Sequence, residues 1–282
     1  MKEFARKQRE ENRIVGLVPT MGALHEGHLS LIKQARQECS SVVASIFVNP
    51  TQFAPSEDFA KYPRSLPSDT EKLENAGVPC LFLPEAKEIY PENYSTYVNV
   101  EGLGERLEGR LRPGHFRGVS TVVMKLLQIV QPQSAYFGRK DAQQAAIISR
   151  MAKDLNFDTE IVVCSIQREA DGLAMSSRNV YLHPCDRQSA AVLHRALQAA
   201  QLLLQNGTRD ALSLLSAIHR VLNEESRAKL DYAEIVDAQT FEPLTHINRK
   251  AYVLIAAKLG ETRLLDNLLV DFSDNGQLTT EL

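Results

Sequence analysis

Apolar and polar positions along residues 1–165 predict strands that alternate with helices. Short, nearly uninterrupted apolar runs are typical of strands that are buried on both faces of a parallel sheet. The runs expected to form strands are 14–18, 42–48, 80–83, 135–138 and 159–164. Apolar residues recur at helical spacing between them, as in Val119, Val122, Val123, Leu126 and Val130 and in Ala145, Ile148, Ala152 and Leu155. This alternation predicts a Rossmann-like, doubly wound parallel sheet of the α/β class.

The rest of the chain follows a different pattern. Two helical patterns come first, over 186–204 and 209–225. Three extended segments rich in β-forming residues follow, over 230–238, 251–259 and 262–270. Gly260-Glu261 is typical of a hairpin turn between the last two. We therefore predict a smaller α+β domain, with domains over 1–166 and 167–282.

Composition narrows the class of protein. A net charge of -3, from 32 Lys and Arg against 35 Asp and Glu, gives no general attraction for nucleic acid. No apolar run approaches the length of a membrane span. The cysteines have no paired spacing, so we expect ordinary thiols in a reducing compartment: Cys39, Cys80, Cys164 and Cys185. The expected protein is cytoplasmic, acts on small molecules and has neither nucleic acid nor a membrane as partner.

The first predicted strand is joined to a helical pattern by the sequence Pro19-Thr20-Met21-Gly22-Ala23-Leu24-His25-Glu26-Gly27-His28. Two imidazoles, His25 and His28, are therefore expected at a helix N-terminus, where unpaired N–H groups and the helix dipole favour an anion. We interpret residues 21–28 as a phosphate corner. The alternative is a glycine-rich turn that carries two exposed histidines.

Three more polar segments lie at loop positions. Asn49 and Gln52 follow the second strand, and their carboxamides suit a small hydroxy acid; amide-capped turn residues are the alternative. In 138–144, Lys140 can reach phosphate oxygens, while Asp141 is expected to cap the following helix; the alternative is a solvated Lys-Asp turn. The segment 168–179 contains Met175-Ser176-Ser177-Arg178, which suits phosphate oxygens, or else is a charged interdomain linker.

Weaker candidates are single residues. Asp69 stands near a predicted helix start, where an aspartate is usually a cap. Arg112 and His115 belong to a basic loop whose simplest interpretation is solvent exposure.

Six motifs, in this order, resemble those of the pantothenate synthetase family, the pantoate–β-alanine ligases. They are P-T-M-G-A-L-H-E-G-H, F-V-N-P-T-Q-F, Y-P-R, G-H-F-R-G-V, K-D-A-Q-Q and R-E-A-D-G-L-A-M-S-S-R-N, within residues 14–182. The resemblance implies a nucleotidyltransferase-type domain that binds ATP and pantoate, a C-terminal lid and a homodimer. It implies ATP as co-substrate, Mg²⁺, and a pantoyl-adenylate intermediate that β-alanine converts to pantothenate.

The resemblance also assigns roles to residues. It implies His28 as proton donor, and His25, Lys140 and Arg178 as the other catalytic groups. ATP is expected on Met21, Gly22, Ala23, Leu24, His25, Glu26, Gly27, His28, Gly138, Arg139, Lys140, Asp141, Gln167, Met175, Ser176, Ser177 and Arg178. Pantoate and β-alanine are expected on Gln52, Gln144, Asn49 and Tyr62, and a metal at Asp69. Arg139 stands where the family commonly has Glu, which is expected to add positive charge near the triphosphate.

Other functions share parts of this pattern. A class I aminoacyl-tRNA synthetase also combines an H-x-G-H-like corner with a later Met-Ser loop, but the short, acidic chain disfavours tRNA binding. A nucleotide-binding regulatory protein needs the phosphate corner without Lys140, Gln52 and Gln144. Another adenylate-forming or nucleotidyl-transferring enzyme of the H-x-G-H superfamily is the remaining alternative.

Overall fold

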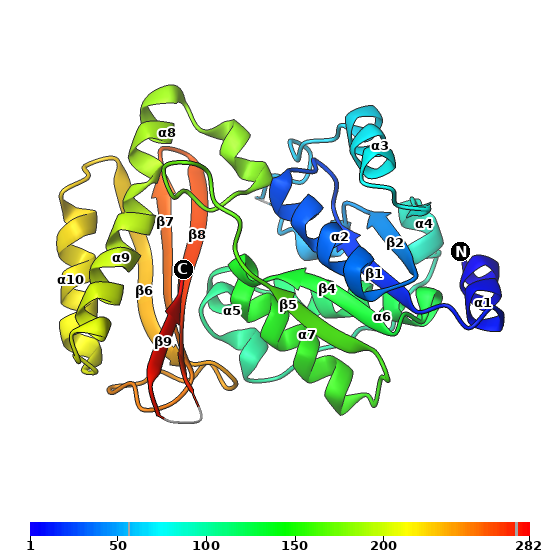
Figure 1. Cartoon of the computed structure of the whole chain (residues 1–282). Coiled ribbons are helices and arrows are strands. Elements are labelled where there is room, and N and C mark those ends of the chain that lie inside the picture. The colour runs from blue at the N-terminus through cyan, green and yellow to red at the C-terminus, as the bar shows by residue number, and fades with distance from the viewer. Residues whose placement is uncertain (56, 274–275) are drawn as a thin grey trace. The chain divides into compact units, whose positions relative to one another are not determined.

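The computed structural model describes residues 1–55, 57–273 and 276–282 (Figure 1). The chain divides into two compact units, Met1–Ser165 and Ile166–Leu282. The boundary predicted between residues 166 and 167 lies one residue from this division.

Within the described residues of the first unit, five parallel strands form one sheet in the order β3-β2-β1-β4-β5. Their bounds are β1 Val15–Thr20, β2 Ser41–Ile46, β3 Cys80–Phe82, β4 Ser134–Gly138 and β5 Glu160–Cys164. The predicted Rossmann-like sheet is confirmed. The strand order reverses between β1 and β4, and ligands of such sheets bind beyond the carboxyl ends of the strands at that point.

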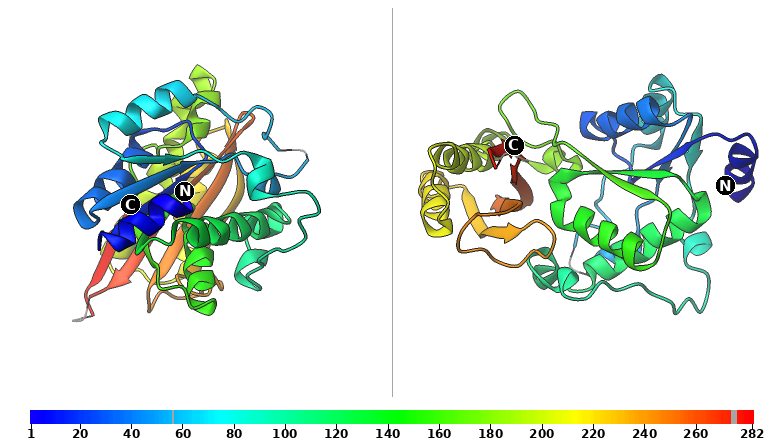
Figure 2. Two further views of the ribbon diagram at one scale, coloured as in Figure 1. Left: turned by 90° about the vertical axis from the view of Figure 1, so that its right-hand side faces the viewer. Right: turned by 60° about the horizontal axis from the view of Figure 1, so that its bottom comes forward.

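Helices cover both faces of this sheet, which explains the apolar runs (Figures 1 and 2). The longer helices are α2 Glu26–Glu38, α3 Leu66–Asn75, α6 His115–Val130 and α7 Ala142–Asp154. Side chains alternate across the pleat: Leu17 and Val43 pack against α6 and α7, whereas Val18 and Ala44 pack against α2 and α3. The shorter elements are α1 Lys2–Glu10, α4 Ala86–Ile89, α5 Glu108–Leu111, η1 Pro50–Gln52, η2 Leu103–Glu105 and η3 Arg139–Asp141.

In the part of the second unit that the structure describes, four antiparallel strands form a sheet in the order β6-β7-β8-β9. An apolar core joins this sheet to its helices. The elements are η4 Ser177–Tyr181, α8 Pro184–Ala190, α9 Val192–Gln205, α10 Ala211–Asn223, β6 Ala228–Asp237, β7 Ala251–Leu259, β8 Thr262–Phe272 and β9 Leu278–Glu281. The predicted α+β character is confirmed, with the β7–β8 turn at Gly260, whose φ is +59°.

Two details of the second unit differ from the expectation. The helix predicted over 186–204 is divided at Ala191, whose ψ of -8° interrupts the helix while its φ stays helical. The spacing of apolar residues did not indicate this interruption of the helix. Strand β9 was not predicted, because its short polar sequence forms a strand only by pairing with β8.

No helix among the described residues is both long and apolar enough to cross a membrane.

Candidate active site

The phosphate corner, residues 21–28, leaves β1 at the carboxyl edge of the sheet through a tight turn. Gly22 has a φ of +84°, and Ala23 adopts a left-handed φ of +51°, which costs conformational energy in a residue with a side chain. The buried Asp69 of α3 holds this turn: Oδ2 accepts from the Ala23 N–H at 2.8 Å, and Oδ1 accepts from the Leu24 N–H at 2.7 Å. The strained turn is thus fixed by a carboxylate from another element.

Lys72 also holds the turn, although this role was not predicted from the sequence. Its Nζ donates to the Leu24 carbonyl at 2.6 Å. Lys72 stands three residues after Asp69 on α3, so both side chains lie on one helix face. The Asp-x-x-Lys spacing is the feature of the sequence that could have indicated this role of Lys72.

His25 and His28 form a reciprocal cap at the start of α2. His25 Nδ1 accepts from the Gly27 N–H at 3.1 Å, and His28 Nδ1 accepts from the His25 N–H at 3.4 Å. The ring centroids are 4.1 Å apart. Because each Nδ1 accepts a hydrogen bond, the proton of each neutral ring lies on Nε2. The predicted strand–turn–helix with both imidazoles at the helix N-terminus is present.

The half-buried His28 is neutral at physiological pH. Its pKa is lowered to about 3, first by desolvation and then by His25, and the cations Lys140 and Lys72 lower it further, whereas Asp141 raises it. The ring therefore offers an N–H donor and carries no positive charge. The influence of Lys140 and Asp141 also means that the ends of β1 and β4 share one electrostatic site.

The loop after β4 corrects one expectation, the cap assigned to Asp141. In the described structure Asp141 stands before α7 but makes no side-chain capping bond to it, because η3 precedes the helix; its Oδ1 lies 3.7 Å from Lys140 Nζ. Arg139, expected near the triphosphate, has a buried side chain. Gln143 is also buried and donates to the carbonyls of Leu103 and Arg106, while Gln144 is half-buried.

Residues 49–53, which we call the acid corner, contact the phosphate corner directly. Asn49 Nδ2 donates to Gln52 Oε1 at 3.0 Å, and Gln52 Nε2 lies 3.1 Å from Met21 Sδ. Tyr62 is buried, with its ring centroid 5.9 Å from that of Phe53. The structure thus brings together the carboxamide segment and the glycine-histidine segment.

The backbone of the acid corner fits closely against α6. A Cβ on Gly118 would lie 2.4 Å from the Thr51 carbonyl oxygen and 2.7 Å from the Gln52 nitrogen. Only glycine allows this approach. Gly118 was not singled out in the sequence, although it belongs to the G-H-F-R-G-V motif.

Arg112 and His115 support Gln52. Their contacts correct the interpretation of a solvent-exposed basic loop. Arg112 binds Glu57 through Nε at 2.6 Å and Nη2 at 2.8 Å, and its Nη1 donates to His115 Nε2 at 3.1 Å. His115 Nδ1–H then donates to the Gln52 carbonyl at 2.8 Å. Desolvation, followed by the charge of Arg112, lowers the pKa of His115 to about 4, so the ring is neutral.

In the second unit, residues 167–175 form a small hairpin. Arg168 and Ala174 make an antiparallel bridge, and the Met175 N–H donates to the Gln167 carbonyl at 2.9 Å. Arg168 anchors the hairpin through Nη1 to Asp266 at 2.8 Å and to the Gly172 carbonyl at 3.0 Å. The segment is therefore built into its unit, whereas a solvated linker would have few such contacts.

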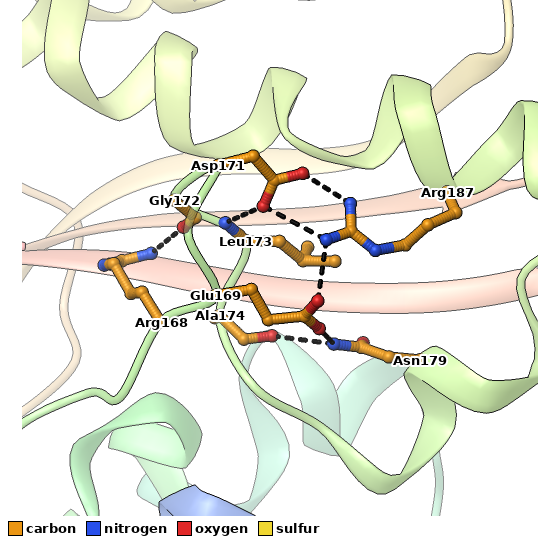
Figure 3. Close-up of polar contacts among 8 residues, drawn as sticks. All are labelled: Arg168, Glu169, Asp171, Gly172, Leu173, Ala174, Asn179 and Arg187. Carbon is orange, nitrogen blue, oxygen red and sulfur yellow. Dashed lines mark hydrogen bonds and ion pairs between the residues drawn. The ribbon is translucent and has the colours of Figure 1, made fainter.

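Arg187 of α8 binds two acidic residues of this hairpin (Figure 3). Its Nη2 donates to Glu169 Oε2 at 2.7 Å and to Asp171 Oδ1 at 3.1 Å. Hydrogen bonding to Arg187 is the main cause that lowers the pKa of Asp171. Glu169 Oε1 also accepts from Asn179 Nδ2 at 2.8 Å. Arg187 was missed in the sequence because it lies outside every motif.

In the sequence, the Ser176-Ser177-Arg178 segment lies between the hairpin of residues 167–175 and Asn179. Ser176 is the N-cap of η4, and its Oγ accepts from the Arg178 N–H at 3.3 Å. The side chains of Ser176, Ser177 and Arg178 are half-buried. Glu169 thus ties Arg187 to Asn179, the residue that follows Arg178.

Comparison with known proteins assigns the family. The sequence matches the family model described as Pantoate-beta-alanine ligase over residues 1–269. The chain belongs to this ligase family. It is 52% identical to the pantothenate synthetase of Koribacter versatilis over 277 residues, which cover 98% of this chain and 95% of that protein. The Acetivibrio thermocellus pantothenate synthetase is also 52% identical, over 96% of each chain.

Solved structures of the ligase family share the fold. The Thermus thermophilus pantothenate synthetase has a TM-score of 0.89 and 47% identity, and the match covers 93% of this chain and 96% of that one. The Francisella tularensis pantoate-beta-alanine ligase has a TM-score of 0.76 and 38% identity, with 95% of each chain covered. That structure is described as a complex with beta-gamma ATP and beta-alanine.

Asp69 does not fit the role of a direct Mg²⁺ ligand. Both of its oxygens accept backbone N–H groups, and only 1% of the residue is exposed. Within the described residues there is no group of three or more His, Cys, Asp or Glu side chains that could hold a metal ion. Mg²⁺ in nucleotide sites keeps several waters and is bound by substrate phosphates together with one or two carboxylates that have oxygens available to it. The geometry of Asp69 instead fits the positioning of the phosphate corner.

Proposed function

We propose that this chain condenses pantoate with β-alanine to form pantothenate, and that the reaction converts ATP to AMP and pyrophosphate. One observation carries the proposal beyond family membership. The acid corner after β2 adjoins the phosphate corner after β1, and the loop after β4 influences the same site from across the strand-order reversal: Gln52 Nε2 lies 3.1 Å from Met21 Sδ, and Lys140 acts on the pKa of His28. An enzyme that joins a carboxylic acid to ATP requires both corners in one place.

The first step is proposed to form pantoyl adenylate. A carboxylate oxygen of pantoate attacks the α-phosphorus of ATP, and the bond to pyrophosphate breaks. Because the nucleophile is weak and both reactants are anionic, positioning and electrostatic stabilisation must supply most of the acceleration. We assign positioning of pantoate to Gln52 and Gln144, and stabilisation of the leaving pyrophosphate to the His28 Nε2–H and Lys140.

In the second proposed step, the neutral amine of β-alanine attacks the acyl carbon and AMP leaves. Water competes for the same mixed anhydride, so the site must exclude it. We propose that the second unit serves as the lid and that Ser176, Ser177 and Arg178 bind phosphate oxygens of ATP. Mg²⁺ is proposed to enter with the ATP phosphates rather than on Asp69, and the enzyme to act as a homodimer.

Isotope exchange tests the function. Labelled pyrophosphate is expected to exchange into ATP when pantoate is present, without β-alanine or tRNA. Exchange that depends on an amino acid instead would select an aminoacyl-tRNA synthetase, and absence of exchange would favour a nucleotide-binding protein without catalysis. Formation of pantothenate after addition of β-alanine completes the test.

Replacement of Arg187 tests the proposed role of the second unit. Arg187→Ala is expected to raise the KM for ATP about five- to tenfold, because it frees Glu169 and Asp171 and loosens the adjacent Ser176–Arg178 segment. Arg187→Lys should recover only part of the loss, since a lysine cannot reproduce the planar fork. Steady-state kinetics measures both variants.

The exposed Arg195 of α9 provides the matched control. Arg195→Ala removes a surface arginine from the same unit and should leave the KM for ATP unchanged. An Arg187→Ala enzyme with a normal KM for ATP contradicts the role of the hairpin.

A further inference from the structure

Asn49 is buried, and its amide lies at the centre of a closed hydrogen-bond network. Its Nδ2 donates to Gln52 Oε1 at 3.0 Å and to the Gly118 carbonyl at 3.1 Å. Its Oδ1 accepts from the Tyr90 hydroxyl at 2.8 Å and from the Thr51 hydroxyl at 2.9 Å. Both N–H groups and the carbonyl oxygen of the amide are therefore used.

Backbone groups determine which way this amide points. The Thr51 N–H, which can only donate, lies 3.3 Å from Asn49 Oδ1. The Gly118 carbonyl, which can only accept, lies 3.1 Å from Asn49 Nδ2. The amide oxygen and nitrogen therefore cannot exchange places.

The orientation of Asn49 fixes that of Gln52. Because Asn49 donates to Gln52 Oε1, the oxygen of the Gln52 amide is engaged and its Nε2 lies on the other side, 3.1 Å from Met21 Sδ. Gln52 consequently offers N–H donors on the side of the phosphate corner. A group bound there must be an acceptor, such as a carboxylate or a hydroxyl oxygen.

Tyr90 closes the network from outside the motifs. It follows α4, and its ring packs against Tyr94 with centroids 5.1 Å apart and against Phe47 at 6.3 Å. Lys125 Nζ lies 5.4 Å from the ring centroid. Desolvation raises the pKa of Tyr90 to about 12, so the hydroxyl remains a donor across the range in which enzymes are assayed.

We propose that Tyr90 is a positioning residue for the hydroxy-acid substrate: its hydroxyl acts through Asn49 to hold Gln52 as a donor toward an acceptor group of that substrate. This inference rests on the proposed function, in which Gln52 binds pantoate. It assigns a task to a residue that lies 41 positions from Asn49 in the sequence.

Tyr90→Phe removes the hydroxyl and keeps the ring. The KM for pantoate is expected to rise about three- to tenfold, the effect of one buried hydrogen bond, while the KM for ATP stays within twofold of the wild-type value. The matched control is Tyr94→Phe, which removes a hydroxyl from the same aromatic stack but not from the contacts to Asn49. It should leave the KM for pantoate unchanged.

A second variant tests whether Tyr90 acts through Asn49. Asn49→Asp cannot donate to Gln52 Oε1, so the Gln52 amide is expected to turn and present its oxygen to the substrate carboxylate. The KM for pantoate should then rise about 100-fold, because a lost charged hydrogen bond is replaced by repulsion. Addition of Tyr90→Phe to Asn49→Asp should change the KM for pantoate less than twofold, since residues in one network are not additive.

Pantoate-dependent exchange by the wild-type enzyme is measured in the same assay, with a thermal melt of each variant. A normal KM for pantoate in Tyr90→Phe, or equal rises in the KM values for pantoate and ATP, overturns the role of Tyr90 and leaves the proposed function intact. Fully additive effects of the two substitutions overturn it as well. Absence of pantoate-dependent exchange in the wild type overturns the proposed function and, with it, the inference.

Discussion

Replacement of His28 with alanine is expected to slow pantoate-dependent pyrophosphate exchange by about two to three orders of magnitude, the effect of removing one preorganised donor to a developing anion. His28 is neutral, and its Nδ1 already accepts the His25 N–H, so its contribution is the Nε2–H. The exchange rate at saturating pantoate and ATP measures the loss.

Two substitutions separate that donor from the helix cap. Asn places its amide oxygen near the position of Nδ1, whereas Gln places an N–H donor near the position of Nε2. His28→Asn should keep the cap and yet be as slow as His28→Ala, while His28→Gln should recover part of the rate. A fast His28→Asn enzyme would show that the cap alone is what matters at this position.

Replacement of Asp69 with alanine is expected to abolish exchange and to lower the free energy of unfolding by about 2–6 kcal/mol. The reason is that the Ala23 and Leu24 N–H groups lose their shared acceptor, and each buried donor left unpaired costs about 1–3 kcal/mol. The left-handed Ala23 then loses the carboxylate that holds it. Chemical denaturation measures the stability, and exchange measured over a range of Mg²⁺ concentrations measures the activity.

The Mg²⁺ series distinguishes a positioning role from a metal-binding role. A carboxylate that positions the phosphate corner is not replaced by added metal, so activity of Asp69→Ala should stay low at every Mg²⁺ concentration. Recovery at high Mg²⁺ with unchanged stability would identify Asp69 as a ligand instead. The exposed Glu71 of α3 is the matched control, and Glu71→Ala should behave as wild type.

Much of the fold could be predicted from local patterns. The buried strands β1 and β2 are apolar runs. The segment from Pro19 through the phosphate corner combines a strand end, small residues and a helix start. The partners of that corner could not be predicted. Lys72 lies 48 residues from Leu24, and Gly118 lies 69 residues from Asn49. No spacing rule reaches across such separations.

The sequence by itself determined the sheet class, the order of the motifs and the residues placed at the ends of β1, β2 and β4, because periodicity and turn chemistry act over a few positions. Only the tertiary structure decided how those residues behave. His28 is neutral because desolvation and its neighbours His25 and Lys140 oppose its protonation, and Gln52 presents donors because Asn49 engages its oxygen. Charge state and amide orientation depend on neighbours in space, and folding brings those neighbours from distant parts of the chain.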